Sequence, residues 1–383
     1  MQFSFPPAQL PETACELRDA VQEFLDRERS AGTWTNAECS GWMAFNRAFS
    51  LRCGAAGFIG MTWPVQYGGQ ERSALERYVV MEEMLAAGAP MGAHWISDRQ
   101  SGPQILKHGN ESLKSAIIPA ICRGEVAFAI GMSEPDAGSD LAAIRSKAHA
   151  VEGGWILNGR KIWTTNGNIA DYMIGLFRTE DAEPGKRHHG MTQFVVKLTS
   201  EGISRRPIAD IPGRDEFAEI VLDDVFVPDD HVLGVPGGGW NLVTAELANE
   251  RSGPDRFLSV FPLLQEVARV LARNPGRFPP SELGRIVTRL SVLREMSMSI
   301  AGQIARGETP ALNAAISKDI GNALEREIPE VLRRYGVVMP ISGGSEADSL
   351  LRDVILSAPS FTLRGGTPEI LRGIIAKGLG LSK

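Results

Sequence analysis

Apolar residues recur every three to four positions along the first third of the chain, which is the spacing of an amphipathic helix. The segments 14–30 and 73–88 both carry this stripe, and the second ends at a glycine suited to terminate a helix. A third segment, 110–125, predicts a helix or a helix pair that Pro119 interrupts. The chain is therefore expected to begin with an all-helical domain.

The pattern changes to short apolar runs, several of them alternating, between about residues 125 and 230. In the segment 146–163, two alternating runs flank Glu152, Gly153 and Gly154, which predicts a β-hairpin. Further strand-like runs follow at intervals suited to a small barrel or sandwich, namely 171–179, 191–199 and 218–228.

Long amphipathic segments return in the last third and are long enough to form a bundle. They are 262–273, 282–306 and 313–336. A chain of 383 residues also exceeds what one simple core accommodates. We therefore predict a multidomain α and β fold: an N-terminal all-α domain, a middle β-barrel or sandwich domain, and a C-terminal four-helix bundle. The predicted boundaries are 1–122, 123–232 and 233–383.

Composition and charge exclude several classes of function. A net charge of −6 argues against nucleic-acid or anionic-membrane partners, which require a concentrated basic surface. No apolar run approaches the ~20 residues of a membrane span, and the first residues show no secretory-signal pattern. The four cysteines form no CxxC pair and the six histidines show no metal-ligand spacing. We expect a cytoplasmic protein without a bound metal.

Two stretches of the β region carry side chains suited to binding. Ser133 and Ser139 follow an apolar strand, where their hydroxyls could hold an anion or a polar ring edge, or could belong to a tight polar turn. Trp163 and Thr165 are two residues apart on a strand and share a face. That pair could stack on and hydrogen-bond to a flat heterocycle, or the indole could be half-buried in the barrel core.

The other candidates lie in the predicted bundle. Thr367 is a natural N-cap of the last helix, and a helix N-terminus offers free amides to an anion or a carbonyl oxygen. Glu246 and Glu250 lie four residues apart, with Arg251 directly after the second. Taken alone, this arrangement indicates an ordinary charged helix face, because such pairs are common and weakly stabilising.

Together and in this order, these stretches resemble the flavin-dependent acyl-CoA dehydrogenases. The resemblance rests on FAIGMSEPDAGSD, NGRKIWTTNGNIAD, EIVLDDVFVPDDHVLG and LRGGTPEILRGIIAKGLG, with WPVQYGGQ in the first domain. It covers the chain from about residue 12 to the end. The family's helical, β and helical architecture agrees with the pattern of elements above.

The resemblance implies FAD as the cofactor, bound between the middle domain and the bundle of a tetramer. Met132 and Ser133 match positions at the pyrimidine edge of the flavin. Trp163 matches a tryptophan packed against the isoalloxazine, and Thr165 matches the threonine that reaches flavin N5.

Four further residues match family positions that bind the cofactor or the substrate. Thr367 and Glu369 match a turn that also touches FAD. Ser139 matches a position near the CoA and flavin phosphates, and Arg251 matches an arginine on the substrate-lining helix. The implied partners are an acyl-CoA substrate and an electron-transferring flavoprotein.

The family's reaction requires a carboxylate that removes the α proton of the thioester. Most members carry this glutamate directly before a Gly-Thr pair, where this chain has Gly365, whose backbone amide could still clamp the thioester. The isovaleryl-CoA and long-chain types place it instead on the helix that opens the bundle, a position matched here by Glu250. We therefore choose Glu250 as the catalytic base and take Glu246 as structural.

Two stretches depart from the family's pattern, and both reach the FAD of a neighbouring subunit in the family. An expected Arg-x-x-Phe-Gly reads ARNPGRFPPSE at 272–282, and an expected Gln-x-x-Gly-Gly reads MPISGGSEADS at 339–349. Arg277 and Gly343–Gly344 are the nearest matches.

Three hypotheses follow from these residues. The first is an active dehydrogenase, either a homotetramer or a heterotetramer with a sister chain. The second is an acyl-CoA oxidase of the same fold. The third is a non-catalytic or half-site subunit that stabilises a partner's FAD site. The acyl group itself is not specified by the sequence, although a base on the bundle helix is compatible with branched, long or bulky chains.

Overall fold

The chain packs into two compact units in a computed structural model. The structure describes residues 3–34, 42–182, 185–251, 253–274, 276–340 and 344–381, and within them every side chain except those of 245–250. The first unit, here called the bundle unit, comprises Met1–Trp42, Arg72–Pro90 and Ala248–Lys383. The second, the sheet unit, comprises Met43–Glu71 and Met91–Leu247. These units group the chain differently from the three domains above, whose boundaries stay a prediction.

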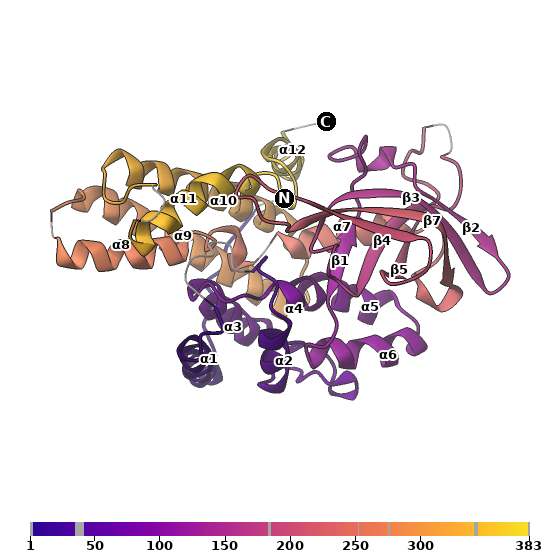
Figure 1. Ribbon diagram of the computed structural model, residues 1–383, viewed down its shortest axis with the longest axis horizontal. Coiled ribbons are helices and arrows are strands. Elements are labelled where there is room, and N and C mark those ends of the chain that lie inside the picture. Colours follow the sequence, from indigo (N-terminus) through magenta and orange to yellow (C-terminus); the bar gives the residue numbers. More distant parts are fainter. Residues whose placement is uncertain are drawn as a thin grey trace. The chain divides into compact units, whose positions relative to one another are not determined.

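The described part of the bundle unit is helical. Its elements are α1 (Glu12–Ser30), α3 (Ala74–Ala86), the 3-10 turn η5 (Pro254–Arg256), α8 (Phe261–Arg273), α9 (Pro280–Ala305), α10 (Ala311–Arg334), α11 (Glu346–Phe361) and α12 (Pro368–Gly378). Helices α8 to α11 form the bundle, and α3 packs between α1 and α9 (Figure 1). The core of the bundle includes the fully buried Leu293, Leu324 and Leu350. The helices predicted at both ends of the chain are confirmed.

Helix α3 shows how local sequence sets the helix ends. The Ser73 hydroxyl accepts a hydrogen bond from the Glu76 amide at 3.2 Å, and the Glu76 carboxylate accepts one from the Ser73 amide at 2.8 Å. This reciprocal capping box satisfies two amides that the first turn would otherwise leave unpaired. At the other end Gly88 adopts a left-handed φ of 64°, which confirms its predicted role at the helix terminus.

The sheet unit combines short helices with a β-sheet. Its helices are α2 (Arg47–Ala55), α4 (Gly92–Ile96), α5 (Gly102–His108), α6 (Glu111–Cys122) and the start of α7 (Gly239–Glu250). Short turns are η1 (Val65–Tyr67), η2 (Ser97–Ser101), η3 (Leu141–Ala143) and η4 (Asp229–His231). The strands are β1 (Phe128–Gly131), β2 (Lys147–Val151), β3 (Gly154–Thr165), β4 (Tyr172–Arg178), β5 (Met191–Lys197), β6 (Ile203–Ile208), β7 (Phe217–Pro228) and β8 (Val232–Leu233).

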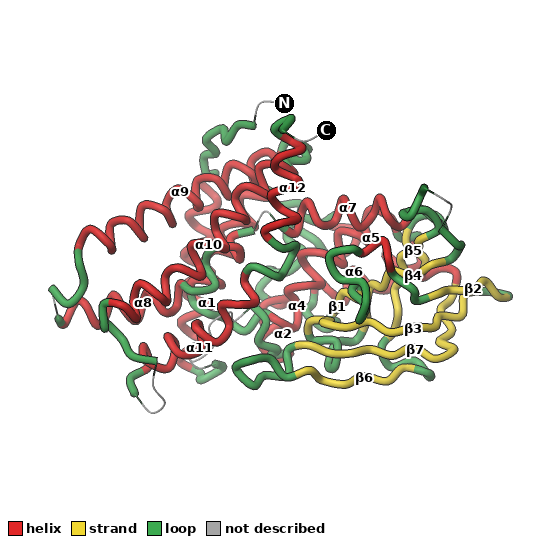
Figure 2. The backbone as a smooth tube through the Cα atoms, turned by 90° about the horizontal axis from the view of Figure 1, so that it is seen from above, coloured by secondary structure: helices red, strands yellow, loops and turns green. Residues whose placement is uncertain are grey.

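The described strands form one eight-stranded sheet in the order β6-β7-β3-β2-β4-β5-β8, with β1 added in parallel to β4. Figure 2 shows the long strands β3, β7 and β6 running side by side. The predicted hairpin is confirmed, because β2 and β3 pair in antiparallel register from Val151 opposite Gly154. Phe177, Phe194 and Leu157 belong to the fully buried core of this sheet.

The predicted interruption at Pro119 is wrong. Helix α6 continues from Glu111 through Pro119 to Cys122. Proline removes one backbone donor, and here that loss falls in the last turn of the helix, where little of the helix remains to be disrupted. The amide of Arg123 still bonds to the Pro119 carbonyl at 3.1 Å, which closes the helix normally.

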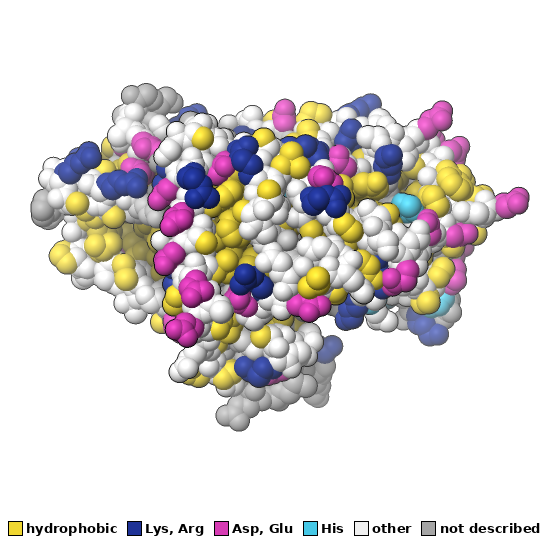
Figure 3. All heavy atoms as spheres, turned by 90° about the horizontal axis from the view of Figure 1, so that it is seen from below, with side chains coloured by type: hydrophobic (Ala, Val, Ile, Leu, Met, Phe, Trp, Pro, Cys, Tyr) yellow, Lys and Arg dark blue, Asp and Glu magenta, His cyan; other side chains and the backbone are white. Residues whose placement is uncertain are grey.

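The surface carries both signs of charge. On the face seen in Figure 3, Lys and Arg side chains lie interspersed with Asp and Glu. None of the helices in the described part of the chain combines the length and hydropathy that a membrane crossing requires.

The capping box of α3 gives a test of this local account. Replacing the cap, Ser73→Ala, should lower the free energy of unfolding by ~1 kcal/mol, because the Glu76 amide loses its acceptor. Ser281→Ala is the matched control, an exposed serine in the first turn of α9 that does not occupy the cap position. Urea unfolding of both variants measures the difference, and equal midpoints would contradict the capping role.

Candidate functional site

The first group of candidate residues lies in the sheet unit, where β1 ends. Met132 and Ser133 follow β1 directly, and both are half-buried. The Ser133 carbonyl accepts a hydrogen bond from the Ile162 amide at 2.9 Å. This bond joins the segment after β1 to β3 immediately before Trp163. The predicted pyrimidine-edge residues and the predicted stacking residue therefore come from adjacent chain segments.

Trp163 stands at an irregularity in β3. The register between β3 and β7 shifts between Lys161 and Thr164, and Trp163 itself has a φ of 58°. The indole is 58% exposed and meets the Phe217 ring edge-on, with 6.0 Å between the centroids. Thr164 is buried, while Thr165 is half-buried. The alternative of an indole half-buried in the β core is therefore wrong, and the aromatic face of Trp163 is accessible for stacking.

A buried ion pair connects the same two segments. The Lys161 ammonium lies 2.7 Å from the Glu134 carboxylate, with side chains 0% and 7% exposed. Lys161 also donates to the Leu176 carbonyl at 2.6 Å, and the same carboxylate accepts the amides of Arg145 and Ser146. Glu134 directly follows Ser133, and Lys161 precedes Trp163 by two residues. The pair therefore fixes the spacing between the two segments.

Burial and the partner charge act against each other in this pair. Burial lowers the pKa of Lys161 to about 8, although the Glu134 carboxylate opposes the change. Burial alone would raise the pKa of Glu134, but the Lys161 ammonium and the backbone donors leave it below its ordinary value. Both groups are consequently charged at neutral pH. Each charge offsets the free-energy cost of burying the other away from water.

Ser139 lies on an exposed loop of the sheet unit. The loop leaves β1 through a tight turn in which the amides and carbonyls of Glu134 and Ala137 bond reciprocally at 2.9 and 3.0 Å. The predicted tight polar turn is therefore present. Ser139 is exposed beyond it, and its proposed role in binding an anion stays a prediction.

The second group lies in the bundle unit, at the turn before α12. Gly365 and Gly366 have left-handed φ values of 64° and 103°, which glycine adopts without the strain a side chain would introduce. Arg251 donates from Nε to the Gly365 carbonyl at 3.1 Å, and Lys318 donates from Nζ to the Gly366 carbonyl at 2.9 Å. Thr367 caps α12, since its hydroxyl accepts from the helix at 3.5 Å, as predicted.

Arg364 anchors the other side of the glycine turn. Its guanidinium donates to the Glu325 carboxylate at 2.8 Å and to the Ser259 hydroxyl at 2.7 Å. It also lies over the rings of Trp42 and Phe361, 5.1 and 4.9 Å from their centroids. Burial raises the pKa of Glu325, and Arg364 opposes that change.

The proposed base lies at the end of α7. Glu250 is the last residue of that helix, and its side chain and that of Glu246 lie outside the described residues. Arg251, the next residue, is described and is 7% exposed. Glu369 is exposed in the first turn of α12, where its own amide and the Thr367 hydroxyl lower its pKa.

The two stretches that depart from the family's pattern both belong to the bundle unit. Asp348 accepts hydrogen bonds from the Met339 amide at 2.6 Å and the Ser345 amide at 2.9 Å, which organises the second stretch. Burial acts to raise the pKa of Asp348, but these hydrogen bonds and the charge of Arg277 lower it below its ordinary value. Gly343 lies outside the described residues, whereas Gly344 is described.

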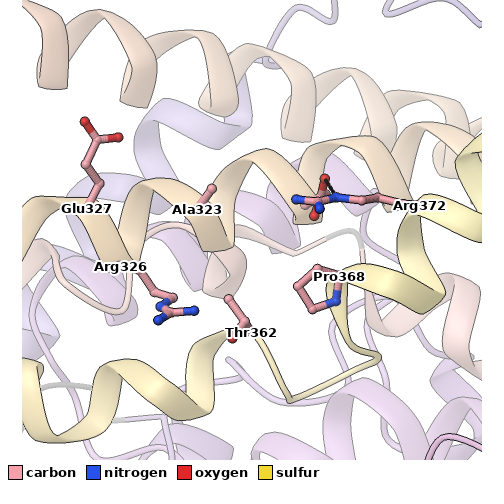
Figure 4. A pocket seen from close by; sticks show the side chains of 7 residues that line it. Ala323, Arg326, Glu327, Thr362, Pro368 and Arg372 are labelled. Carbon is pink, nitrogen blue, oxygen red and sulfur yellow. Dashed lines mark hydrogen bonds and ion pairs between the residues drawn. The ribbon is translucent and has the colours of Figure 1, made fainter.

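A cavity of about 390 Å³ opens beside the start of α12 (Figure 4). It is lined by side chains of α10, α12 and the end of α11, namely Asp319, Ala323, Arg326, Glu327, Thr362, Pro368 and Arg372. Asp319 and Arg372 already pair at 3.4 Å across it. The cavity borders Pro368, which lies between the two residues of α12 that match family positions touching FAD.

The residues present suit a flat, anionic cofactor. In the sheet unit, Trp163 is exposed, and the half-buried Ser133 and Thr165 lie on the same pair of segments, which the Ile162–Ser133 backbone hydrogen bond joins. In the bundle unit, Thr367 and the first amides of α12 form a polar helix end. Among the described residues, no three His, Cys, Asp or Glu side chains gather in a way that would hold a metal ion.

Sequence reasoning missed the buried lysines. Lys318 lies on α10 at helical spacing from the buried Ala314 and Gly321. A cation within an apolar helix stripe could therefore have indicated a buried lysine from the sequence. Lys161 lies on β3 and is fully buried. A buried charge requires a partner, and the partner comes from elsewhere in the chain, which no local pattern shows.

Removing one member of the buried pair should destabilise the sheet unit strongly. Glu134→Gln leaves the Lys161 ammonium buried without a counter-charge, so we expect the free energy of unfolding to fall by about 3–5 kcal/mol. The control is Asp140→Asn, which breaks an ion pair with Arg187 whose two side chains are each 60% exposed. That change should cost less than about 1 kcal/mol. Urea unfolding that gives equal losses would contradict the account.

Comparison with protein families gives two matches. Residues 11–125 match the model of the acyl-CoA dehydrogenase N-terminal domain, and residues 129–225 match the model of the acyl-CoA dehydrogenase middle domain. Two solved structures share the fold over 100% of both chains at 26% identity. They are the Tcur3481-Tcur3483 steroid ACAD, with a TM-score of 0.86, and the ChsE4-ChsE5 complex from Mycobacterium tuberculosis, with a TM-score of 0.82.

Relatives from Mycobacterium tuberculosis match at higher identity. Acyl-CoA dehydrogenase FadE34 is 32% identical over 84% of this chain, which spans only 44% of that relative's length. Acyl-CoA dehydrogenase FadE26 is 31% identical over 394 aligned residues, which cover 98% of this chain and 97% of FadE26. The predicted family and its helical, sheet and helical fold are thereby confirmed: the chain belongs to the acyl-CoA dehydrogenase family of oxidoreductases.

Proposed function

We propose that this chain is an FAD-dependent acyl-CoA dehydrogenase that converts an acyl-CoA thioester to the trans-2-enoyl-CoA. Membership of the family supports the reaction class. The observation that carries the cofactor assignment is the accessible Trp163 indole on β3, which belongs to the same unit as Thr165 and as the Ser133 segment that a backbone hydrogen bond joins to β3. Met132, Thr367 and Glu369 complete the proposed FAD contacts, while Ser139 and Arg251 are proposed to contact the acyl-CoA.

The proposed chemistry divides between the chain and its cofactor. Glu250 removes the α proton, and the Gly365 amide donates a hydrogen bond to the thioester oxygen as negative charge develops on it. Bound FAD would supply the acceptor for the β hydrogen, which would leave as a hydride, so that two electrons leave the substrate and a C=C bond forms. The base requires a pKa raised from its ordinary ~4.3 toward neutrality. Electrons then pass to an electron-transferring flavoprotein.

The acyl group is proposed to be bulky. A glycine at position 365 leaves open the volume that a glutamate side chain would fill. One structural neighbour that covers the whole chain is named a steroid ACAD, which supports a ring-bearing thioester as the first substrate to try. Branched and long acyl chains remain compatible with the same open position.

A second candidate is a subunit of a heteromeric acyl-CoA dehydrogenase, in which a sister chain completes the FAD site. Both structural neighbours are named as pairs of proteins, and one is called a complex. The two stretches that depart from the family's pattern also favour this assembly. Expressing the chain alone and together with a candidate sister chain distinguishes the two candidates. A self-sufficient chain expressed alone should form a homotetramer with one FAD per chain.

Glu250→Gln tests the proposed base. The variant should keep its flavin, while anaerobic flavin reduction by the responding acyl-CoA slows by about 10²–10⁴-fold, because general-base assistance is lost. Glu246→Gln is the matched control, a carboxylate one turn earlier on α7. Rapid mixing with short, branched, long and ring-bearing acyl-CoAs measures both variants. Unchanged reduction by Glu250→Gln would rule out this base, and oxygen consumption without an added acceptor would favour an oxidase.

Trp163→Ala tests the proposed stacking face. Loss of the indole should raise the FAD dissociation constant about tenfold, yet leave the stability of the flavin-free protein nearly unchanged, because the side chain is 58% exposed. Trp155→Ala is the control, since that half-buried ring packs edge-on against Phe194 at 5.5 Å and contributes to the core. It should lower stability by roughly 3 kcal/mol. Flavin fluorescence and thermal unfolding measure both, and unchanged FAD affinity in Trp163→Ala would contradict the assignment.

A further inference from the structure

We propose that Lys318 is a positioning residue of the dehydrogenation, holding the glycine turn so that the Gly365 amide is presented to the thioester oxygen. Lys318 reaches the turn from α10 and does not itself touch the reacting atoms in this assignment. The inference rests on the proposed function, because it assumes that the Gly365 amide binds the thioester.

The geometry of the turn requires an external restraint. Both glycines lack a Cβ and adopt φ values of 64° and 103°, so side-chain sterics do not hold them there. Lys318 is 0% exposed and binds the Gly366 carbonyl at 2.9 Å. Arg251 binds the Gly365 carbonyl at 3.1 Å. Cations therefore bind the carbonyls of two consecutive peptide groups, Gly365–Gly366 and Gly366–Thr367, and restrain both.

The N-terminal side of the turn is fixed as well. Arg364, directly before Gly365, is tied to Glu325 and Ser259. Gly365 thus lies between two anchored neighbours, although its own conformation is intrinsically permissive. No described residue accepts a hydrogen bond from the Gly365 amide. A donor that is held rigidly and left without an internal partner suits an oxygen that becomes negative in the transition state.

The charge around the turn favours the same outcome. The buried and half-buried cations here outnumber the buried carboxylates: Arg251, Arg256, Lys318 and Arg364 against Asp255 and Glu325. Lys318 therefore adds a positive charge near the turn and, through its hydrogen bond, holds the Gly366 carbonyl.

The test compares two ligands that differ only at the carbonyl. Octanoyl-CoA carries the thioester oxygen, whereas S-octyl-CoA is the thioether without it. Binding of each to the FAD-loaded protein is measured by calorimetry for wild type, Lys318→Met and Lys318→Gln. Asn322→Leu is the matched control, a buried residue one turn along α10 whose amide has no hydrogen-bond partner among the described residues. Thermal unfolding of each variant is measured alongside.

We expect wild type and Asn322→Leu to prefer the thioester, and Lys318→Met to lose roughly tenfold of that preference while binding the thioether normally. Lys318→Gln, which keeps a donor without the charge, should fall between them and serves if the methionine variant does not fold. Equal loss for both ligands in the lysine variants, or failure of both variants to fold, would reduce Lys318 to a structural role and overturn the inference. Failure of wild type to bind either ligand would overturn this inference, whereas the proposed function is tested separately by flavin reduction with ring-bearing, branched and long acyl-CoAs.

Discussion

Two buried cations bind the backbone carbonyls of Gly365 and Gly366, in the turn before the last helix. They hold these glycines in a conformation that the sequence of the turn does not itself enforce. Gly365 and Gly366 gain freedom by lacking a side chain, and that freedom has an entropic cost on folding. The bonds from Arg251 and Lys318 offset this cost locally. A turn without a carboxylate can thus retain an oriented amide, and in the proposed function Glu250 of α7 supplies the carboxylate.

The sheet unit uses the same physical device. Lys161 is fully buried, binds the Leu176 carbonyl, and pairs with Glu134 beside the segment that carries Ser133. In both units, a buried lysine would lose much free energy without its hydrogen-bond or ion-pair partners. It therefore favours the one backbone arrangement that supplies them. The exposed Trp163 depends on this rigidity. An accessible aromatic ring can stack on a ligand in one orientation only if the strand that carries it stays fixed.

Periodicity predicted the elements well because helix and strand spacing are local properties. It predicted the N-cap at Thr367 for the same reason. The shared face of Trp163 and Thr165 stays a prediction, because the register of β3 shifts between Lys161 and Thr164 and Trp163 has a positive φ. It failed at Pro119, where position within the helix decided the effect of proline, and it could not find Lys318, whose partner lies 48 residues away in sequence. The proposed flavin-binding and base residues came from resemblance to a family, since no single stretch specified them.

The most direct test of the central claim is an anaerobic titration of the purified flavoprotein with ring-bearing, branched and long acyl-CoAs. The flavin absorbance and the enoyl-CoA formed are followed together. The account predicts one FAD per chain, bleaching by at least one thioester, and one trans-2-enoyl-CoA released for each flavin reduced. A chain that purifies without flavin, or flavin that no acyl-CoA reduces, would contradict it.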